Sequence, residues 1–208
     1  MRTRIYVDGF NLYFGALRKT PHKWLDLAAM ARSHLDSRNA IIGIKYFTAK
    51  ISPRPGDNGQ TSRQEIYFRA LRTIPNLEIF FGHFLSSIIS MPFAAPAPDG
   101  PRFARMVKTE EKGSDVNIAS QLLKDAYGRT MDCAVIVSGD SDLLMPLQIV
   151  KNELGIPVGV LNPQERPCRV LKAHATFYKH LRRGKLARSQ FPSVLTDATG
   201  RFTRPQSW

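Results

Sequence analysis

The chain has 208 residues, 43% of them hydrophobic, which is enough for one folded domain with a substantial core. Its 30 Lys and Arg against 17 Asp and Glu give a formal net charge of +13, which favours a polyanionic partner such as nucleic acid. Two cysteines are too few for a disulfide framework or a zinc ribbon. With no signal peptide and no apolar run of about 18 residues, we expect a cytoplasmic protein without a membrane partner.

Short β-branched or aromatic runs alternate with longer helical patterns along the chain. The patterns predict strands at 4–7, 41–49, 77–81, 133–137 and 156–161, and helices at 25–35, 61–73, 114–127, 141–154 and 170–181. The continuous apolar run at 133–137 is typical of a central parallel strand. Strands separated by helices indicate βαβ units, so we expect an α/β fold with a mainly parallel sheet and helices on both faces.

Three stretches interrupt this alternation. Residues 52–59 are rich in Pro and Gly and predict a loop. Four prolines within 90–102 predict an insertion without regular structure. Residues 182–208 carry six basic residues against one acid and predict a basic, partly disordered tail that follows a domain of residues 1–181.

Four carboxylates stand at informative places. Asp8 follows the first strand, Asp140 and Asp142 follow the strand at 133–137, and Asp115 opens a helix. Ligands of open α/β sheets bind at the carboxyl ends of the strands, so we expect these acids to converge there. Clustered carboxylates repel one another unless a cation lies between them, and oxygen ligands suit Mg²⁺ or Mn²⁺. Such a metal can activate water against a phosphodiester, which predicts a metal-dependent nuclease.

Each acid also has a structural interpretation. Asp115, Asp140 and Asp142 are residue types that cap helices, and Asp8 before Gly9 is typical of an Asx-turn. Taken singly, each acid leaves the two interpretations open. Taken together, they favour a site, because a buried strand that ends in a carboxylate is costly without compensation and this pattern occurs twice.

Three motifs together resemble the NYN domain, a PIN-like family that includes LabA-like proteins. They are YVDGFNLY at residues 6–13, EKGSDVN at 111–117 and SGDSD at 138–142, and the resemblance extends over about residues 4–181. It implies a PIN-like three-layer α/β/α sandwich with a central, mainly parallel sheet. It also implies a Mg²⁺- or Mn²⁺-dependent ribonuclease that acts on RNA in preference to DNA.

The motifs assign site residues one by one. The resemblance implies that the acids hold the metal, that one amide and one hydroxyl orient a carboxylate, a water or the phosphate, and that all six serve catalysis; they are Asp8, Asp115, Asp140, Asp142, Asn11 and Ser138. Many relatives carry a further Asp where this chain has Gln121, which bears on how many metal ions bind.

Several cations are candidates for contacts with nucleic-acid phosphates. They are Lys45 and Lys50 near the end of the second strand, Lys112 before Asp115, and Arg182, Arg183 and Lys185 in the tail. For Lys112, a solvated surface lysine is an equal alternative. A catalytically inactive RNA-binding module with the same fold is the alternative function. A phosphatase of the haloacid dehalogenase type is disfavoured, because Phe10 stands where that class needs a second Asp.

Overall fold

A computed structural model describes residues 1–52, 59–96 and 98–208, so nearly all of the predicted loop at 52–59 lies outside the described residues. Seven strands form one sheet in the order β4-β3-β2-β1-β5-β6-β7. In chain order they are β1 (Arg2–Asp8), β2 (Ala40–Ala49), β3 (Leu77–Pro92), β4 (Phe103–Lys112), β5 (Cys133–Val137), β6 (Val158–Asn162) and β7 (Phe177–His180). β3 and β4 pair antiparallel, and the other neighbours pair parallel.

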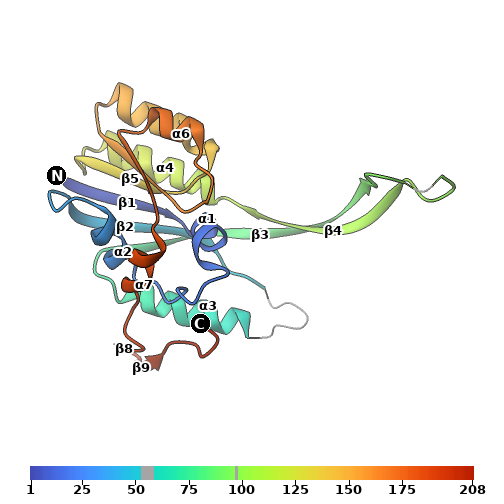
Figure 1. The fold of residues 1–208 in the computed structure, drawn as a ribbon, viewed down its shortest axis with the longest axis horizontal. Helices are drawn as coiled ribbons and strands as arrows, with labels where there is room; N and C mark the ends of the chain where they lie inside the picture. Colours follow the sequence, from blue (N-terminus) through green and yellow to red (C-terminus); the bar gives the residue numbers. More distant parts are fainter. Residues whose placement is uncertain (53–58, 97) are drawn as a thin grey trace.

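Helices cover both faces of the sheet. α4 (Ser114–Tyr127) and α6 (Arg169–His174) lie on one side, whereas α2 (Leu27–His34), α3 (Gln60–Arg72) and α7 (Arg183–Arg188) lie on the other (Figure 1). The short helices are α1 (Gly9–Leu12), which continues into a π-helical turn Tyr13–Leu17, and α5 (Leu144–Gln148), flanked by a 3₁₀ turn Ser141–Leu143 and a π turn Ile149–Glu153. This three-layer arrangement confirms the predicted PIN-like α/β class. In the described part of the chain, no helix has the length and hydropathy to cross a bilayer.

The alternation of side chains along β1 divides the core into two layers. Ile5 and Val7 pack with residues of α2 and α3, such as Leu27 and Leu71. Tyr6 points to the opposite face and packs with α4 through Ile118. β5 is buried along its whole length, as its continuous apolar run predicts for a central strand. The ends of β1 and β5 therefore lie side by side in the middle of the sheet.

The segment predicted as an irregular insertion at 90–102 is the connection at the tip of a β-arm, and among its described residues only Ser90–Pro92 belong to a strand. β3 continues to Pro92 rather than ending near Phe81, and β4 pairs with it in continuous register from His83–Lys112 to Pro92–Phe103. The prolines fall at the end of β3 and in the connection, where they interrupt no ladder. The apolar and β-branched side chains of β3 and β4, on either side of this connection, favour strand. The arm projects away from the rest of the molecule (Figure 1).

The predicted helix at 170–181 is divided between helix and strand. α6 ends at His174, Ala175 is extended, and Phe177–His180 joins β6 as the edge strand β7. The aromatic pair Phe177 and Tyr178 fits a pleated surface better than a helix, which explains the difference.

The predicted partly disordered tail at 182–208 is folded. It forms α7 and a hairpin of β8 (Val194–Asp197) and β9 (Gly200–Thr203). Its aromatic residues Phe191, Phe202 and Trp208 surround the buried Trp24, with ring centroids 5.6, 6.5 and 6.3 Å away. The prediction of disorder rested on the basic charge of the segment, whereas the burial of these apolar side chains holds it on the body.

Candidate functional site

Asp8 stands at the carboxyl end of β1 and begins α1. Its carboxylate accepts a hydrogen bond from the Asn11 N–H at 2.9 Å, so Asp8 caps α1 instead of closing the Asx-turn that its place before Gly9 suggested. The following turn requires glycine, because a Cβ on Gly9 would lie 2.7 Å from the ring of Tyr46 and from the Phe47 carbonyl. The side chain of Asp8 is only 4% exposed, and burial, with the charges of Asp115 and Asp140, raises its pKa to about 6.

Polar side chains tie the end of β1 to the end of β5. The Ser138 hydroxyl donates to the second oxygen of Asp8 at 3.0 Å and accepts from the Asp140 N–H at 3.0 Å. The amide oxygen of Asn11 accepts from the Gly139 N–H at 2.9 Å and from Gln164 at 3.0 Å. Asp8 is therefore held by two donors, and the predicted residues Asn11 and Ser138 orient the site's backbone and carboxylate.

Asp115 enters the site from the first turn of α4. The helix starts after Gly113, whose φ of 101° favours glycine. Glu111 accepts hydrogen bonds from the backbone and the hydroxyl of Ser114, at 3.2 and 2.9 Å, and so fixes this turn. Partial burial raises the pKa of Asp115, and the negative charges of Asp140, Glu111 and Asp142 add to this effect. The carboxylates of three separate segments thus influence one another.

Asp140 and Asp142 follow β5 as predicted. One oxygen of Asp140 accepts from the Asp142 N–H at 3.0 Å and caps the short 3₁₀ turn, so Asp140 also has a structural role. Asp140 lines a cavity at the carboxyl end of the sheet, whereas Asp142 is exposed to solvent.

A cavity of about 1010 Å³ lies at this end of the sheet, and Asp8, Glu111, Asp115 and Asp140 line one part of it. Their donor chemistry fits a hard divalent cation, because all are carboxylates, and burial with the added repulsion of their neighbours raises the pKa values of Asp8 and Asp115. Across residues 1–52, 59–96 and 98–208, no three acidic, His or Cys side chains are placed closely enough to form a complete ligand set. Three of the four predicted acids, Asp8, Asp115 and Asp140, therefore line this cavity together with Glu111, whereas Asp142 does not line it.

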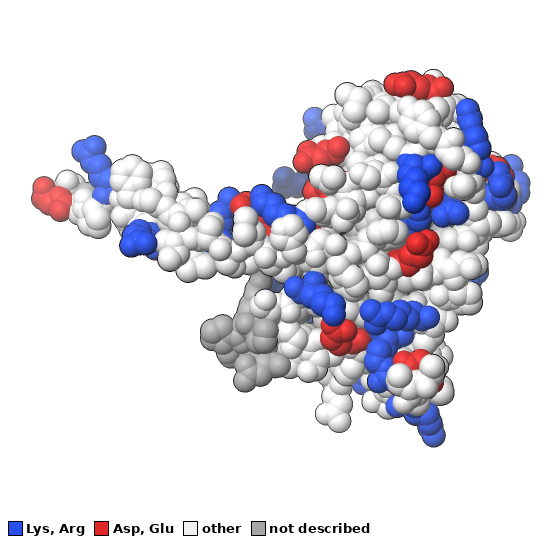
Figure 2. Space-filling model, turned by 180° about the vertical axis from the view of Figure 1, so that it is seen from behind, with Lys and Arg blue, Asp and Glu red and all other residues white. Residues whose placement is uncertain are grey.

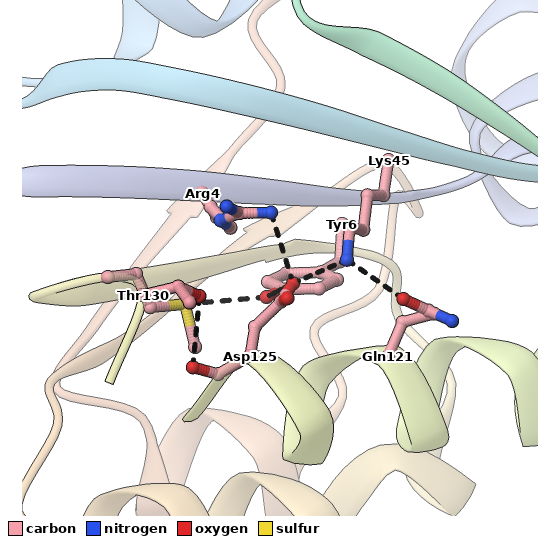
Figure 3. Close-up of polar contacts among 7 residues, drawn as sticks. Arg4, Tyr6, Lys45, Gln121, Asp125 and Thr130 are labelled. Atoms are coloured by element: carbon pink, nitrogen blue, oxygen red, sulfur yellow. Dashed lines mark hydrogen bonds and ion pairs between the residues drawn. The ribbon is translucent and has the colours of Figure 1, made fainter. Parts of the chain in front are cut away.

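Lys45 does not face this cavity, contrary to the prediction of a phosphate contact. It is 5% exposed, and its ammonium donates to Asp125 at 2.6 Å and to Gln121 at 2.8 Å (Figure 3). Tyr6 donates to the same Asp125 oxygen at 2.7 Å. The side chain lies inside the sheet–α4 interface, since residues of β2 alternate between the two faces. Gln121, the position at which the family resemblance implies a further acid, is thus a partner of Lys45.

The other predicted cations lie at the surface. Lys50 pairs with Glu65 at 3.0 Å, and Lys112 lies 3.6 Å from Glu110, so both have an acidic neighbour. Arg182 and Arg183 are exposed at the start of α7, and the Lys185 ammonium donates to the Ser33 carbonyl. On the face shown in Figure 2, basic side chains are scattered over the body and arm among acidic ones, rather than gathered in one stripe.

Two residues at the candidate site were not predicted from the sequence. Gln164 comes from the loop after β6, and its amide reaches Asn11 across the sheet end. Glu111 belongs to the second motif and lies next to a helix start, which was the available sign of its role. The pairing of two distant loops around Asn11 depends on tertiary structure, and no local pattern encodes it.

Three similarities to known proteins bear on the identity of the chain. The family model described as NYN domain matches residues 2–181. The curated protein 6-hydroxy-3-succinoylpyridine 3-monooxygenase HspA of Pseudomonas putida (strain DSM 28022 / S16) is 34% identical over 238 aligned residues, which cover 100% of this chain and 75% of that protein. A crystal structure of VPA0982 from Vibrio parahaemolyticus RIMD 2210633, a protein of unknown function, matches with a TM-score of 0.55 at 14% identity, over 87% of this chain and 93% of that one. The last similarity is one of fold alone.

Proposed function

The chain belongs to the NYN domain family, and from this premise we propose that it is a divalent-metal-dependent ribonuclease that hydrolyses RNA phosphodiester bonds. The observation that carries the proposal is the convergence of Asp8, Asp115 and Asp140 on one cavity at the carboxyl end of the sheet. Those carboxylates come from three segments far apart in sequence, and burial together with neighbouring negative charges raises the pKa of Asp8 and of Asp115. A +13 chain that gathers acids in one cavity has the polarity expected for binding a cation beneath a polyanion.

The proposed roles follow from the contacts. Asp8, Asp115, Asp140 and Asp142 would hold Mg²⁺ or Mn²⁺, which supplies Lewis-acid stabilisation and a more acidic water when bound. Asn11 and Ser138 keep the loop after β5 and the Asp8 carboxylate in fixed positions through their hydrogen bonds. Hydrolysis adds water across the phosphodiester and yields a phosphomonoester and a hydroxyl group. No covalent nucleophile is needed, and the exposed cations Lys50, Lys112, Arg182 and Arg183 would contact phosphates of the same strand.

The test is cleavage of end-labelled RNA and DNA with Mn²⁺, Mg²⁺ or EDTA, comparing the wild type with Asp140→Asn. We expect metal-dependent cleavage of RNA and a loss of at least a hundredfold in the variant, because the amide removes a negative charge from the site. Asp36→Asn is the matched control, since Asp36 is exposed and pairs with Arg38 away from the cavity. Equal cleavage by Asp140→Asn and the wild type, with both folded, would refute the assignment.

Two other activities are outcomes of the same experiment. RNA binding without cleavage under every metal condition would identify a catalytically inactive RNA-binding module. The name of the Pseudomonas putida relative describes a monooxygenase acting on a pyridine, and its identity extends over the whole chain. If RNA is neither bound nor cut, the next assay is hydroxylation of 6-hydroxy-3-succinoylpyridine with O₂ and a two-electron reductant. The convergent carboxylates favour the nuclease over that alternative.

A further inference from the structure

The cavity has a second wall that the proposed chemistry does not use. Four aromatic residues line it beside the carboxylates, and we call them the aromatic ledge: Phe10, Tyr13, Phe14 and Phe84. The Phe10 ring lies 6.5 Å from Phe14 in a stacked orientation and 5.7 Å from Phe84 edge-on. Tyr13 meets Phe14 edge-on at 5.3 Å. The ledge is therefore one continuous surface of rings, built by the first helical segment and the base of the arm.

The helical segment that carries the rings also carries a carboxylate at its start and a cation at its end, an order that suits a bound nucleotide chain. Phe10, Phe14 and Arg18 are spaced by four residues, which places them on one face of the segment that Asp8 caps. The Arg18 guanidinium lies 5.4 Å from the centre of the Phe14 ring and lines the same cavity. Carboxylate, ring and cation thus succeed one another along a single wall.

Phe14 is the exposed member of the ledge. It is 57% exposed although it lies next to a cavity and among other rings. The residues around it are already fixed by their own contacts, since Tyr13 and Phe10 are partly buried. A largely exposed aromatic side chain beside a guanidinium is the combination on which single-stranded nucleic acids stack.

We propose that the aromatic ledge is a nucleobase subsite for single-stranded RNA, in which a base next to the cleaved bond stacks on Phe14 and the following phosphate meets Arg18. The inference rests on the proposed function and deepens it, because it names the form of the substrate. Bases in a duplex are already stacked and cannot offer a free face to the ring. The ledge therefore selects unpaired RNA.

Binding is measured by fluorescence polarisation in EDTA, so that no cleavage occurs and the readout is independent of catalysis. Phe14→Ala should weaken binding of an unpaired RNA oligonucleotide about 5- to 150-fold, the range for loss of one stacked base. Phe14→Trp should restore it, and binding of a blunt RNA duplex should not change. Phe103→Ala is the matched control, because Phe103 is 59% exposed but lies in β4 at the far end of the arm. Arg18→Gln should make the negative slope of log K against log salt shallower by about 0.7.

The outcomes separate the two proposals. If Phe14→Ala binds unpaired RNA as the wild type does, or loses unpaired and duplex RNA equally, the base subsite is refuted while the nuclease stands. The stacked base is supported if Phe14→Ala weakens binding and if an abasic site in the oligonucleotide then causes no further loss of affinity for this variant. If the wild type binds no RNA in EDTA or in Mg²⁺, the proposed function fails and the subsite with it.

Discussion

At the scale of single residues, the buried group around Asp125 explains how α4 is fixed against the sheet. One oxygen of Asp125 accepts from Tyr6 and Lys45 and lies 3.5 Å from Arg4 (Figure 3). Burial and this carboxylate raise the pKa of the Tyr6 phenol, so the phenol stays protonated and donates. Because α4 carries Asp115 in its first turn, the network sets the position of one acid of the candidate site without touching it.

Removing one partner from this network should be costly. Lys45→Met leaves the Asp125 carboxylate buried without its ammonium, and the free energy of unfolding should fall by roughly 3–5 kcal/mol. The double variant Lys45→Met with Asp125→Asn should recover part of the loss, since no unpaired charge remains. Urea unfolding followed by circular dichroism measures both. Lys50→Met is the control, because that lysine and its partner Glu65 are exposed and their pair should contribute little. Equal midpoints for Lys45→Met and Lys50→Met would contradict the account.

At the scale of elements, the local sequence pattern predicted a central strand and a long helix best. The predicted strand at 133–137 and the predicted helix at 114–127 coincide with β5 and α4. Both are long or apolar enough that neighbours do not change their type. The β-arm could not be predicted, because its strands show no regular alternation of apolar and polar side chains and bury no face, and the prolines around its tip suggest a loop. β7 depends on pairing with β6 rather than on its own four residues.

The arm should be separable from the stability of the body. Among the described residues, none between His83 and Lys112 belongs to the buried core. Deleting 87–108 and joining Ser86 to Thr109 through Asn-Gly keeps the cross-strand pair at the base, whose hydroxyls lie 2.8 Å apart. The melting temperature should change by no more than about 2 °C, as measured by differential scanning fluorimetry. A loss of about 10 °C would show that the arm stabilises the body.

At the scale of the whole molecule, the sequence motifs located the acids that line one cavity better than they located the end of the folded domain. The three motifs led to Asp8, Asp115 and Asp140, and the parallel sheet brings these acids to one cavity. Gln164 and the buried role of Lys45 came only from the structure, since both depend on contacts between distant segments. The family match ends at residue 181, yet the packing continues through residues 182–208 around Trp24. A count of charged residues could not reveal that the burial of a few aromatic rings holds this basic segment on the body.

This docked segment should respond to pH through His34. The ring is buried, with Nδ1 2.9 Å from the Met30 carbonyl, and its Nε2 accepts from the Arg182 N–H at 3.2 Å, which requires the neutral form. Burial and the nearby Lys185, Lys179 and Arg182 charges lower its pKa below 6.5. The unfolded state then binds the proton more readily, so the stabilisation is complete above about pH 6.5 and declines as the pH falls through the lowered value.

Trp24 reports on this segment, because Phe191, Phe202 and Trp208 pack around it. From pH 7.5 to 5, the urea midpoint of the tryptophan fluorescence transition should fall in the wild type. In His34→Gln it should start lower and fall less, since the titrating ring is absent. His83→Gln, at an exposed histidine of β3, should keep the wild-type pH profile. The same fall in His34→Gln as in the wild type would assign the pH dependence to other groups and leave His34 with a packing role alone.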